Sequence, residues 1–185
     1  MMQLQRRNKA GYTLVEVLIV VSIMGILSSI GVVSFRQAIA NARVKDAALN
    51  TAAFLERVGN LSKQRSDVIC LMIDVSDSLT LLALKSKGSD CTGDNKYDTE
   101  VLDRLKVDAP VKFVPTGTCN FVGVDMTGVN AAFIPHIGFS SVPEGAVCVK
   151  YGSESVFGSA QKLSTSNSVK AFWKIGDGSS SWDEL

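Results

Sequence analysis

The sequence predicts an α+β protein in which one long N-terminal helix precedes a head domain rich in β-strands. Two observations support this prediction. An apolar run and then an amphipathic stripe follow each other without a proline from position 12 to about position 60. Short runs of apolar and β-branched residues, separated by glycine, proline and serine, occupy most of the remaining chain. We therefore expect the second half of the helix to pack on the head.

Length and charge restrict the class of function. A chain of 185 residues allows one compact domain with an appendage, not a large multidomain enzyme. The 19 Lys and Arg residues nearly balance the 18 Asp and Glu residues, so there is no basic excess typical of nucleic-acid binding. The sequence contains no phosphate-binding loop, no dinucleotide fingerprint and no HExxH. We expect a protein that is not an enzyme, with no cofactor and no bound metal.

Residues 12–35 form an apolar run whose only charged residue is Glu16. A helix needs about 20 apolar residues to cross the bilayer, and this run is too long for the core of an ordinary signal peptide. Three basic residues lie just before the run, whereas only Arg36 follows it closely. This asymmetry predicts a cytoplasmic N-terminus, with the body of the protein outside in an oxidising compartment.

Glu16 is the unusual residue of this run, because it lies about one helical turn inside it. A carboxylate in hydrocarbon costs several kcal/mol unless it is protonated or paired. In one interpretation its side chain simply reaches the membrane interface. In the other it needs a cation at the same depth, and the segment contains none. Cleavage just before Tyr12 would supply one, as a new N-terminal amine.

The segment KAGYTLVEV, residues 9–17, closely resembles the processing site of type IV prepilins and type II secretion pseudopilins. The shared features are a short basic leader ending in glycine, an aromatic residue, Thr-Leu, a glutamate five residues after the cut, and an apolar helix. The resemblance implies that prepilin peptidase cleaves between Gly11 and Tyr12 and methylates the new amine. It also implies that Thr13 and Glu16 act in assembly. Tyr12 replaces the usual phenylalanine but keeps the aromatic ring.

The same resemblance implies a lollipop-shaped, type IV pilin-like fold and a filament in which Glu16 meets the terminal amine of a neighbouring subunit. The implied segments are a cleaved leader (1–11), a transmembrane and assembly helix (12–35), an amphipathic second half (36–61) and a periplasmic β-rich head (62–185). The implied location is the bacterial inner membrane, single-pass, and then the filament. The implied partners are prepilin peptidase, other pilin or pseudopilin subunits and the assembly platform. Many major pilins carry proline where this chain has Val33, so its absence favours a minor pilin or pseudopilin.

Helical spacing continues beyond Phe35. The apolar face of this second half consists of Val44, Ala47, Ala48, Thr51, Leu55 and Val58. Charged and amide side chains occupy the other face. Gly59 and Asn60 are expected to end the helix. A coiled coil is the alternative, but the stripe is narrow and lasts under four heptads.

Strands are expected in the rest of the chain. Residues 68–73 and 79–84 predict a hairpin, and further candidates are 101–107, 111–114, 121–124, 131–134, 146–151 and 169–174. Residues 152–168 are rich in serine and glycine and are expected to form a mobile loop or a hairpin tip, and 176–181 a similar tail. The seven aromatic residues expected to build the core are Phe121, Phe133, Phe139, Phe157, Phe172, Trp173 and Trp182.

Residues 12–84 show a looser resemblance to the H-type pseudopilin and its FimT-like minor pilin relative. It implies a structural subunit of a type II secretion pseudopilus or a type IV pilus, and the sequence does not choose between them. The alternatives are a minor pilin that binds DNA or another ligand at the filament tip, and an ordinary anchored periplasmic domain. Some FimT-like relatives bind DNA through a basic C-terminal region. Here the end is acidic, and Lys150, Lys162, Lys170 and Lys174 are interpreted as scattered and not as a patch, so nucleic acid is not expected.

Four cysteines, Cys70, Cys91, Cys119 and Cys148, all follow the membrane run. An even number outside the cytoplasm favours two disulfides, for which three pairings are open. Zinc is the competing interpretation, but no CxxC spacing supports it.

Two further features are candidate sites. Asp90, Asp94, Asn95, Asp98 and Glu100 bring together oxygen atoms that could hold calcium, although their spacing is not that of an EF-hand and a solvated turn is the simpler explanation. His136 is the only histidine, and it is interpreted as a loop residue, not as a catalytic base.

Overall fold

The computed structural model of the protein describes residues 11–74, 76–88, 91, 97–119, 124–125, 132–134, 138–139, 145–162, 168–176 and 181–185. These ranges contain the helix α1 (Leu14–Arg65) followed by strands that pair mainly antiparallel. The α+β class predicted from the sequence is therefore confirmed. The chain divides into two compact units, Met1–Ile39 and Ala40–Leu185, each described here by itself.

The two ends of α1 have local causes. At the start, the Thr13 hydroxyl accepts a hydrogen bond from the backbone N–H of Glu16 at 3.2 Å, which satisfies one of the unpaired donors of the first turn. At the end, Ser66 adopts the left-handed conformation, with φ of 54°, that commonly ends helices. The helix therefore continues past Gly59 and Asn60, where the sequence predicted its end. Packing explains the difference, because Ser62 is buried and its hydroxyl donates to the Asp67 carbonyl at 2.8 Å.

In the first unit, α1 exposes its apolar side chains. Leu18, Met24 and Leu27 are 59%, 62% and 64% exposed. By length and composition alone, α1 is able to cross a membrane. Two hydroxyls of this segment bond locally: Ser22 donates to the Leu18 carbonyl and Ser29 to the Ile26 carbonyl. These two hydroxyls are thereby satisfied within the helix itself.

The second unit contains two sheets. The first sheet has the spatial order β3 (Tyr97–Lys106), β2 (Thr80–Ser86), β1 (Ile69–Ile73), β6 (Ala132–Ile134) and β7 (Gly138–Phe139). The second sheet has the order β11 (Asp183–Glu184), β10 (Val169–Ile175), β9 (Val156–Lys162), β8 (Gly145–Tyr151) and β4 (Val111–Val114), with β5 (Val124–Asp125) parallel to β8. A 3-10 turn, η1 (Thr116–Cys119), follows β4.

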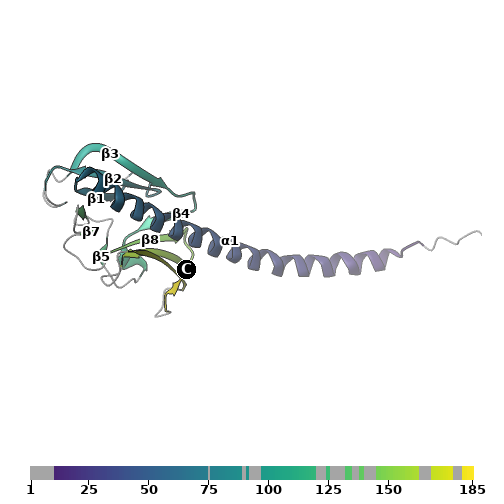
Figure 1. Ribbon diagram of the computed structural model, residues 1–185. Coiled ribbons are helices and arrows are strands. Elements are labelled where there is room, and N and C mark those ends of the chain that lie inside the picture. The colour runs from purple at the N-terminus through teal and green to yellow at the C-terminus, as the bar shows by residue number, and fades with distance from the viewer. Residues whose placement is uncertain are drawn as a thin grey trace, which may run out of the picture. The chain divides into compact units, whose positions relative to one another are not determined.

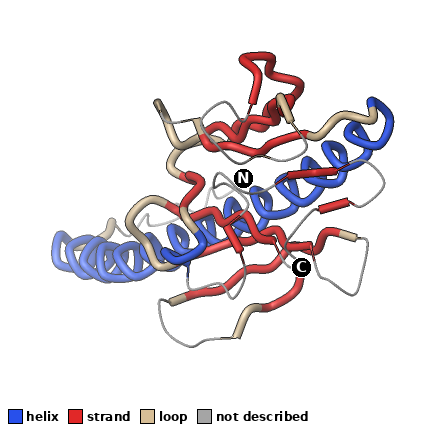
Figure 2. Tube along the Cα trace, turned by 90° about the vertical axis from the view of Figure 1, so that its left-hand side faces the viewer, coloured by secondary structure: helices blue, strands red, loops and turns tan. Residues whose placement is uncertain are grey.

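The second half of α1 runs between these two sheets, with β1, β2 and β3 on one side and β8 on the other (Figure 1, Figure 2). The face predicted to be apolar is buried along its whole length, including Thr51. Ala40, Ala52 and Phe54 are buried as well, so the apolar stripe is wider than predicted. A helix covered by sheets on two sides needs this wider stripe, whereas a helix on one flat surface does not.

Gly158 in β9 marks the closest approach of α1 to the second sheet. A Cβ atom at this position would lie 2.9 Å from the Val44 side chain, 3.0 Å from Ala48 and 2.9 Å from Val149. Only glycine allows the helix and the strand to approach this closely.

The strand predictions had mixed outcomes. The hairpin β1–β2 is confirmed, and β3, β4, β6, β8 and β10 occupy the predicted runs within a few residues. The expectation of a loop or hairpin tip over 152–168 is correct for residues 152–155, which connect β8 to β9, and wrong for Val156–Lys162, which form β9 and pair with both β8 and β10. The serines and glycine of β9 pointed to a loop, but Ser159 is fully buried and Gly158 is needed for close packing.

Candidate functional site

The segment at the predicted cleavage site is accessible. Gly11, Tyr12 and Thr13 precede α1 and are not helical, and Tyr12 is 84% exposed. A Cβ atom at Gly11 would meet nothing within 4 Å. The Gly11–Tyr12 bond therefore lies outside the helix. Residues 1–10, the rest of the predicted leader, lie outside the described part of the chain.

Glu16 lies in the first turn of α1, and its side chain is exposed. Thr13 and Glu16 have the Thr-x-x-Glu spacing of a capping box, and a carboxylate near a helix N-terminus interacts favourably with the helix dipole. The ion pairs among the described residues are Arg57–Asp103, Lys85–Asp67 and Lys170–Glu184, so Glu16 belongs to none of them. Its predicted counter-ion, the amine of a neighbouring subunit, stays a prediction.

The four cysteines form two disulfides, Cys70–Cys91 and Cys119–Cys148. The Cα atoms are 5.7 Å and 6.6 Å apart, within the usual range. The second disulfide joins η1 to β8. It packs with Val114, Phe157 and Trp182 in a small apolar cluster separate from the main core. With all four thiols used in this way, the structure supports the disulfide interpretation over the zinc interpretation.

The candidate calcium ligands and His136 give no site within the described ranges. Asp90, Asp94, Asn95 and the side chain of Asp98 lie outside them, as does His136, so the calcium and histidine interpretations stay untested. Among the described residues, no group of three or more His, Cys, Asp or Glu side chains is placed to hold a metal ion.

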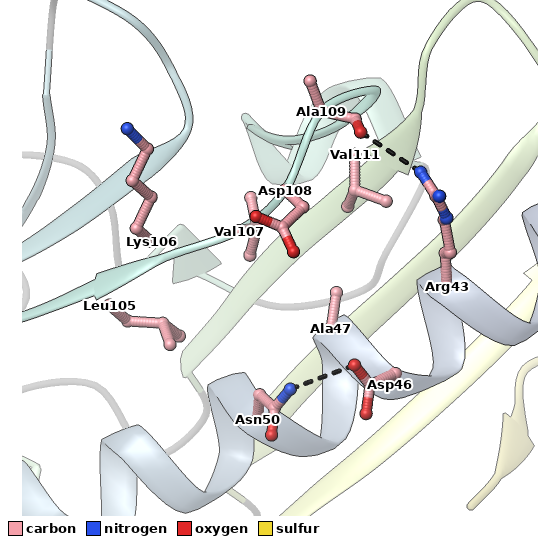
Figure 3. A pocket seen from close by; sticks show the side chains of 10 residues that line it. All are labelled: Arg43, Asp46, Ala47, Asn50, Leu105, Lys106, Val107, Asp108, Ala109 and Val111. Carbon is pink, nitrogen blue, oxygen red and sulfur yellow. Dashed lines mark hydrogen bonds between the residues drawn. The ribbon is translucent and has the colours of Figure 1, made fainter.

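A groove of about 480 Å³ separates α1 from the connection between β3 and β4 (Figure 3). Arg43 donates to the Ala109 carbonyl at 3.2 Å, and Asn50 donates to the Asp46 carboxylate at 3.2 Å (Figure 3). The charged side chains that line the groove are two bases and two acids: Arg43, Lys106, Asp46 and Asp108. This balance selects for neither an anion nor a cation, so we interpret the groove as part of the junction between helix and sheet.

Lysines that are scattered in the sequence gather on the second sheet. The Lys150 ammonium lies 5.1 Å from the centre of the Phe157 ring, and the Lys174 ammonium lies 5.5 Å from the same ring. The interpretation of these two lysines as scattered is therefore wrong in space. The two lysines become neighbours only through the pairing of β9 with β8 and β10, and the composition of β9 predicts a loop and not a strand. Lys170 differs, since it pairs with Glu184 at 2.7 Å.

The comparisons with known proteins concern the N-terminal segment. Residues 6–32 match the family model described as the prokaryotic N-terminal methylation motif. No curated protein and no solved structure matches the chain. The matched range contains Gly11, Tyr12 and Glu16. The motif indicates a precursor like those of type IV pilins and pseudopilins, which are structural proteins processed by prepilin peptidase and assembled with other pilin subunits.

Proposed function

We propose that the protein is a minor pilin or pseudopilin, a structural subunit of a type II secretion pseudopilus or a type IV pilus. The observation that carries this proposal is the methylation motif over residues 6–32, in which an accessible Gly11–Tyr12 bond directly precedes a long apolar helix. The absence of proline from this helix supports a minor role. The β1–β2 hairpin after the helix and the β-rich second unit support the H-type, FimT-like subtype.

Electrostatics explains how processing would be coupled to assembly. Before cleavage, the Glu16 carboxylate has no cation within the apolar run. Cleavage creates a positively charged amine on Tyr12 of every mature copy. An unpaired charge is costly in a medium of low dielectric constant, whereas a paired one is tolerated. Adjacent subunits therefore prefer the axial stagger that brings one copy's amine to the other copy's Glu16.

This proposal places the N-terminus in the cytoplasm, the apolar half of α1 in the inner membrane and the second unit in the periplasm. The two disulfides fit an oxidising compartment. Prepilin peptidase, the assembly platform and other filament subunits are the proposed partners.

Intact-mass measurement of the assembled protein tests the processing step. We expect a chain that begins with N-methylated Tyr12. Gly11→Val should block cleavage without disturbing the fold, because a side chain at this position meets nothing within 4 Å. A full-length chain starting at Met1 in working filaments would refute the assignment.

Substitution of Glu16 tests the assembly step. We expect Glu16→Leu to be inserted and processed normally but to enter filaments at least about tenfold less often, because the pairing that favours the correct stagger is lost. Val15→Leu is the matched control, since it changes size but not charge on the same turn. The measurement is the ratio of filament-bound to membrane-bound subunit on immunoblots. Equal ratios for Glu16→Leu and the control would remove the proposed role of Glu16.

A further inference from the structure

Lys174 in β10 is an unusually buried cation. The residue is only 3% exposed, and its ammonium lies 5.0 Å from the Trp182 ring and 5.5 Å from the Phe157 ring. The face of β10 that packs against α1 carries Val169 and Ala171. Because side chains alternate along a strand, Lys174 lies on the opposite face, away from that core. There it borders the small cluster that contains the Cys119–Cys148 disulfide.

The sheet register adds two more lysines to this face. Phe157 in β9 lies directly opposite Lys174 on one side and directly opposite Lys150 on the other. Lys150 in turn lies directly opposite Lys112 in β4. Directly opposite residues in an antiparallel pair share a face, so three lysines and one phenylalanine form a single row across four strands. Two like charges placed directly opposite each other destabilise a sheet unless a counter-charge compensates them.

The described part of the chain supplies no such counter-charge. None of its ion pairs includes Lys112, Lys150 or Lys174. Aromatic rings attract an ammonium, but this attraction offsets only part of the cost of removing a charge from water. Lys170, on the same face, shows the contrasting case, because Glu184 neutralises it directly.

We propose that Lys150 and Lys174, flanking Phe157, form a binding site for a phosphate group, with Lys112 at its exposed edge. The donors are lysines and not arginines. A lysine binds phosphate as a compact point charge. A phosphate group carries a charge of about −1.5 to −2 at pH 7 and can therefore compensate two lysines, whereas a carboxylate carries a single charge. The burial of Lys174 favours one small phosphate or phosphate monoester over a long polymer that lies along the surface. This proposal does not depend on the filament role.

Trp182 provides the reporter, because its ring lies over the Lys174 ammonium. The chain has two tryptophans, so Trp173→Phe leaves Trp182 as the only one. The full-length chain, in micelles of an uncharged detergent, is titrated with inorganic phosphate at constant ionic strength and pH 7. We expect a saturable change in Trp182 emission and a rise in melting temperature, since a ligand that binds the folded state stabilises it. Acetate at the same ionic strength should bind at least about tenfold more weakly.

Three variants in this background locate the site. Lys174→Met should lower phosphate affinity by at least about tenfold, and Lys150→Met, which changes a less buried residue, by about threefold or more. Lys170→Met is the matched control, because it removes a cation from the same strand and face that is already paired, and it should leave phosphate affinity unchanged. Glycerol phosphate in place of phosphate tells whether the site takes an ester or only the free ion.

Two results would overturn the proposal of a phosphate site, and a third would overturn the ligand class. The absence of a saturable response in folded protein would overturn the proposal, as would equal phosphate affinity in Lys150→Met and Lys170→Met. Acetate binding as tight as phosphate binding would overturn the assignment of the ligand class. Should Lys174→Met fail to fold, as judged by circular dichroism, the comparison between Lys150→Met and Lys170→Met alone decides.

Discussion

The two halves of α1 share one helical backbone but differ in the exposure of their apolar side chains. In the first half, Leu27 is 64% exposed and Val33 is 61% exposed, whereas in the second half Val44 and Leu55 are completely buried. Both halves are helical without a break. The chain is therefore helical both where its side chains are exposed and where they are buried. The difference is that two sheets of the same chain cover the second half, whereas the apolar surface of the first half is exposed, and the proposed function assigns it to lipid and to other subunits.

The largest expected effect on the free energy of unfolding comes from comparing the same substitution, Leu to Ala, in each half of the helix. Leu55→Ala should lower the free energy of unfolding of the second unit by about 2–5 kcal/mol, because it leaves a cavity between two sheets. Leu27→Ala should change it by less than about 0.5 kcal/mol, because in detergent this side chain meets the micelle in both the folded and the unfolded state. Chemical denaturation of the two purified variants, followed by tryptophan fluorescence, measures both values.

For filament incorporation, the order of the two variants Leu55→Ala and Leu27→Ala should be reversed. Leu27→Ala removes apolar surface from the proposed spanning segment, so we expect the larger effect on filament incorporation from this variant. Equal destabilisation of the second unit by the two variants would contradict the conclusion that only the second half of α1 stabilises that unit.

Much of this division could be predicted from the sequence. Local patterns can be recognised without knowledge of the tertiary structure. They include the apolar run, the amphipathic stripe and the processing residues Gly11, Tyr12 and Glu16. The matched methylation motif covers the same segment. Phe54 shows the limit, because its burial widens the predicted stripe and goes with a helix covered by sheets on two sides, which helical spacing alone does not reveal.

The features that could not be predicted depend on contacts between residues far apart in the sequence. β9 contains glycine and serine where propensity favours loops, and only its neighbours β8 and β10 make it a strand. The row of lysines also depends on β9, since its Phe157 lies between Lys150 and Lys174. Likewise, four cysteines allowed three pairings, and the choice among them required the fold.

A smaller effect is expected where the second half of α1 meets β9. Gly158→Ala should cost about 1–3 kcal/mol of unfolding free energy, because the new methyl group overlaps Val44, Ala48 and Val149. Gly88→Ala is the matched control, since a Cβ atom there meets nothing within 4 Å. Combining Gly158→Ala with Val44→Ala should cost less than the sum of the two single changes, because it removes one of the overlaps. Strict additivity in denaturation experiments would show that the helix and strand are not in this close contact.

The smallest effect belongs to Asp74, in the turn between β1 and β2, where charge and not burial provides the stability. The hydroxyl of Ser76 donates to its carboxylate at 2.6 Å and the backbone N–H of Ser76 at 2.9 Å, and together they hold the Asp74 pKa below its ordinary value of 3.8. A lowered pKa in the folded state gives stability that is present above pH 3.8 and is lost as the pH falls through the folded-state pKa. Asp74→Asn should therefore be slightly less stable than wild type at pH 6 and approach it at low pH, whereas the deficit of Leu55→Ala should persist at both. Denaturation curves at the two pH values measure this, and Ser76→Ala, which removes the first-named donor, should reproduce part of the change. A deficit of Asp74→Asn that is equally large at both pH values would mean that turn geometry, not ionisation, is its cause.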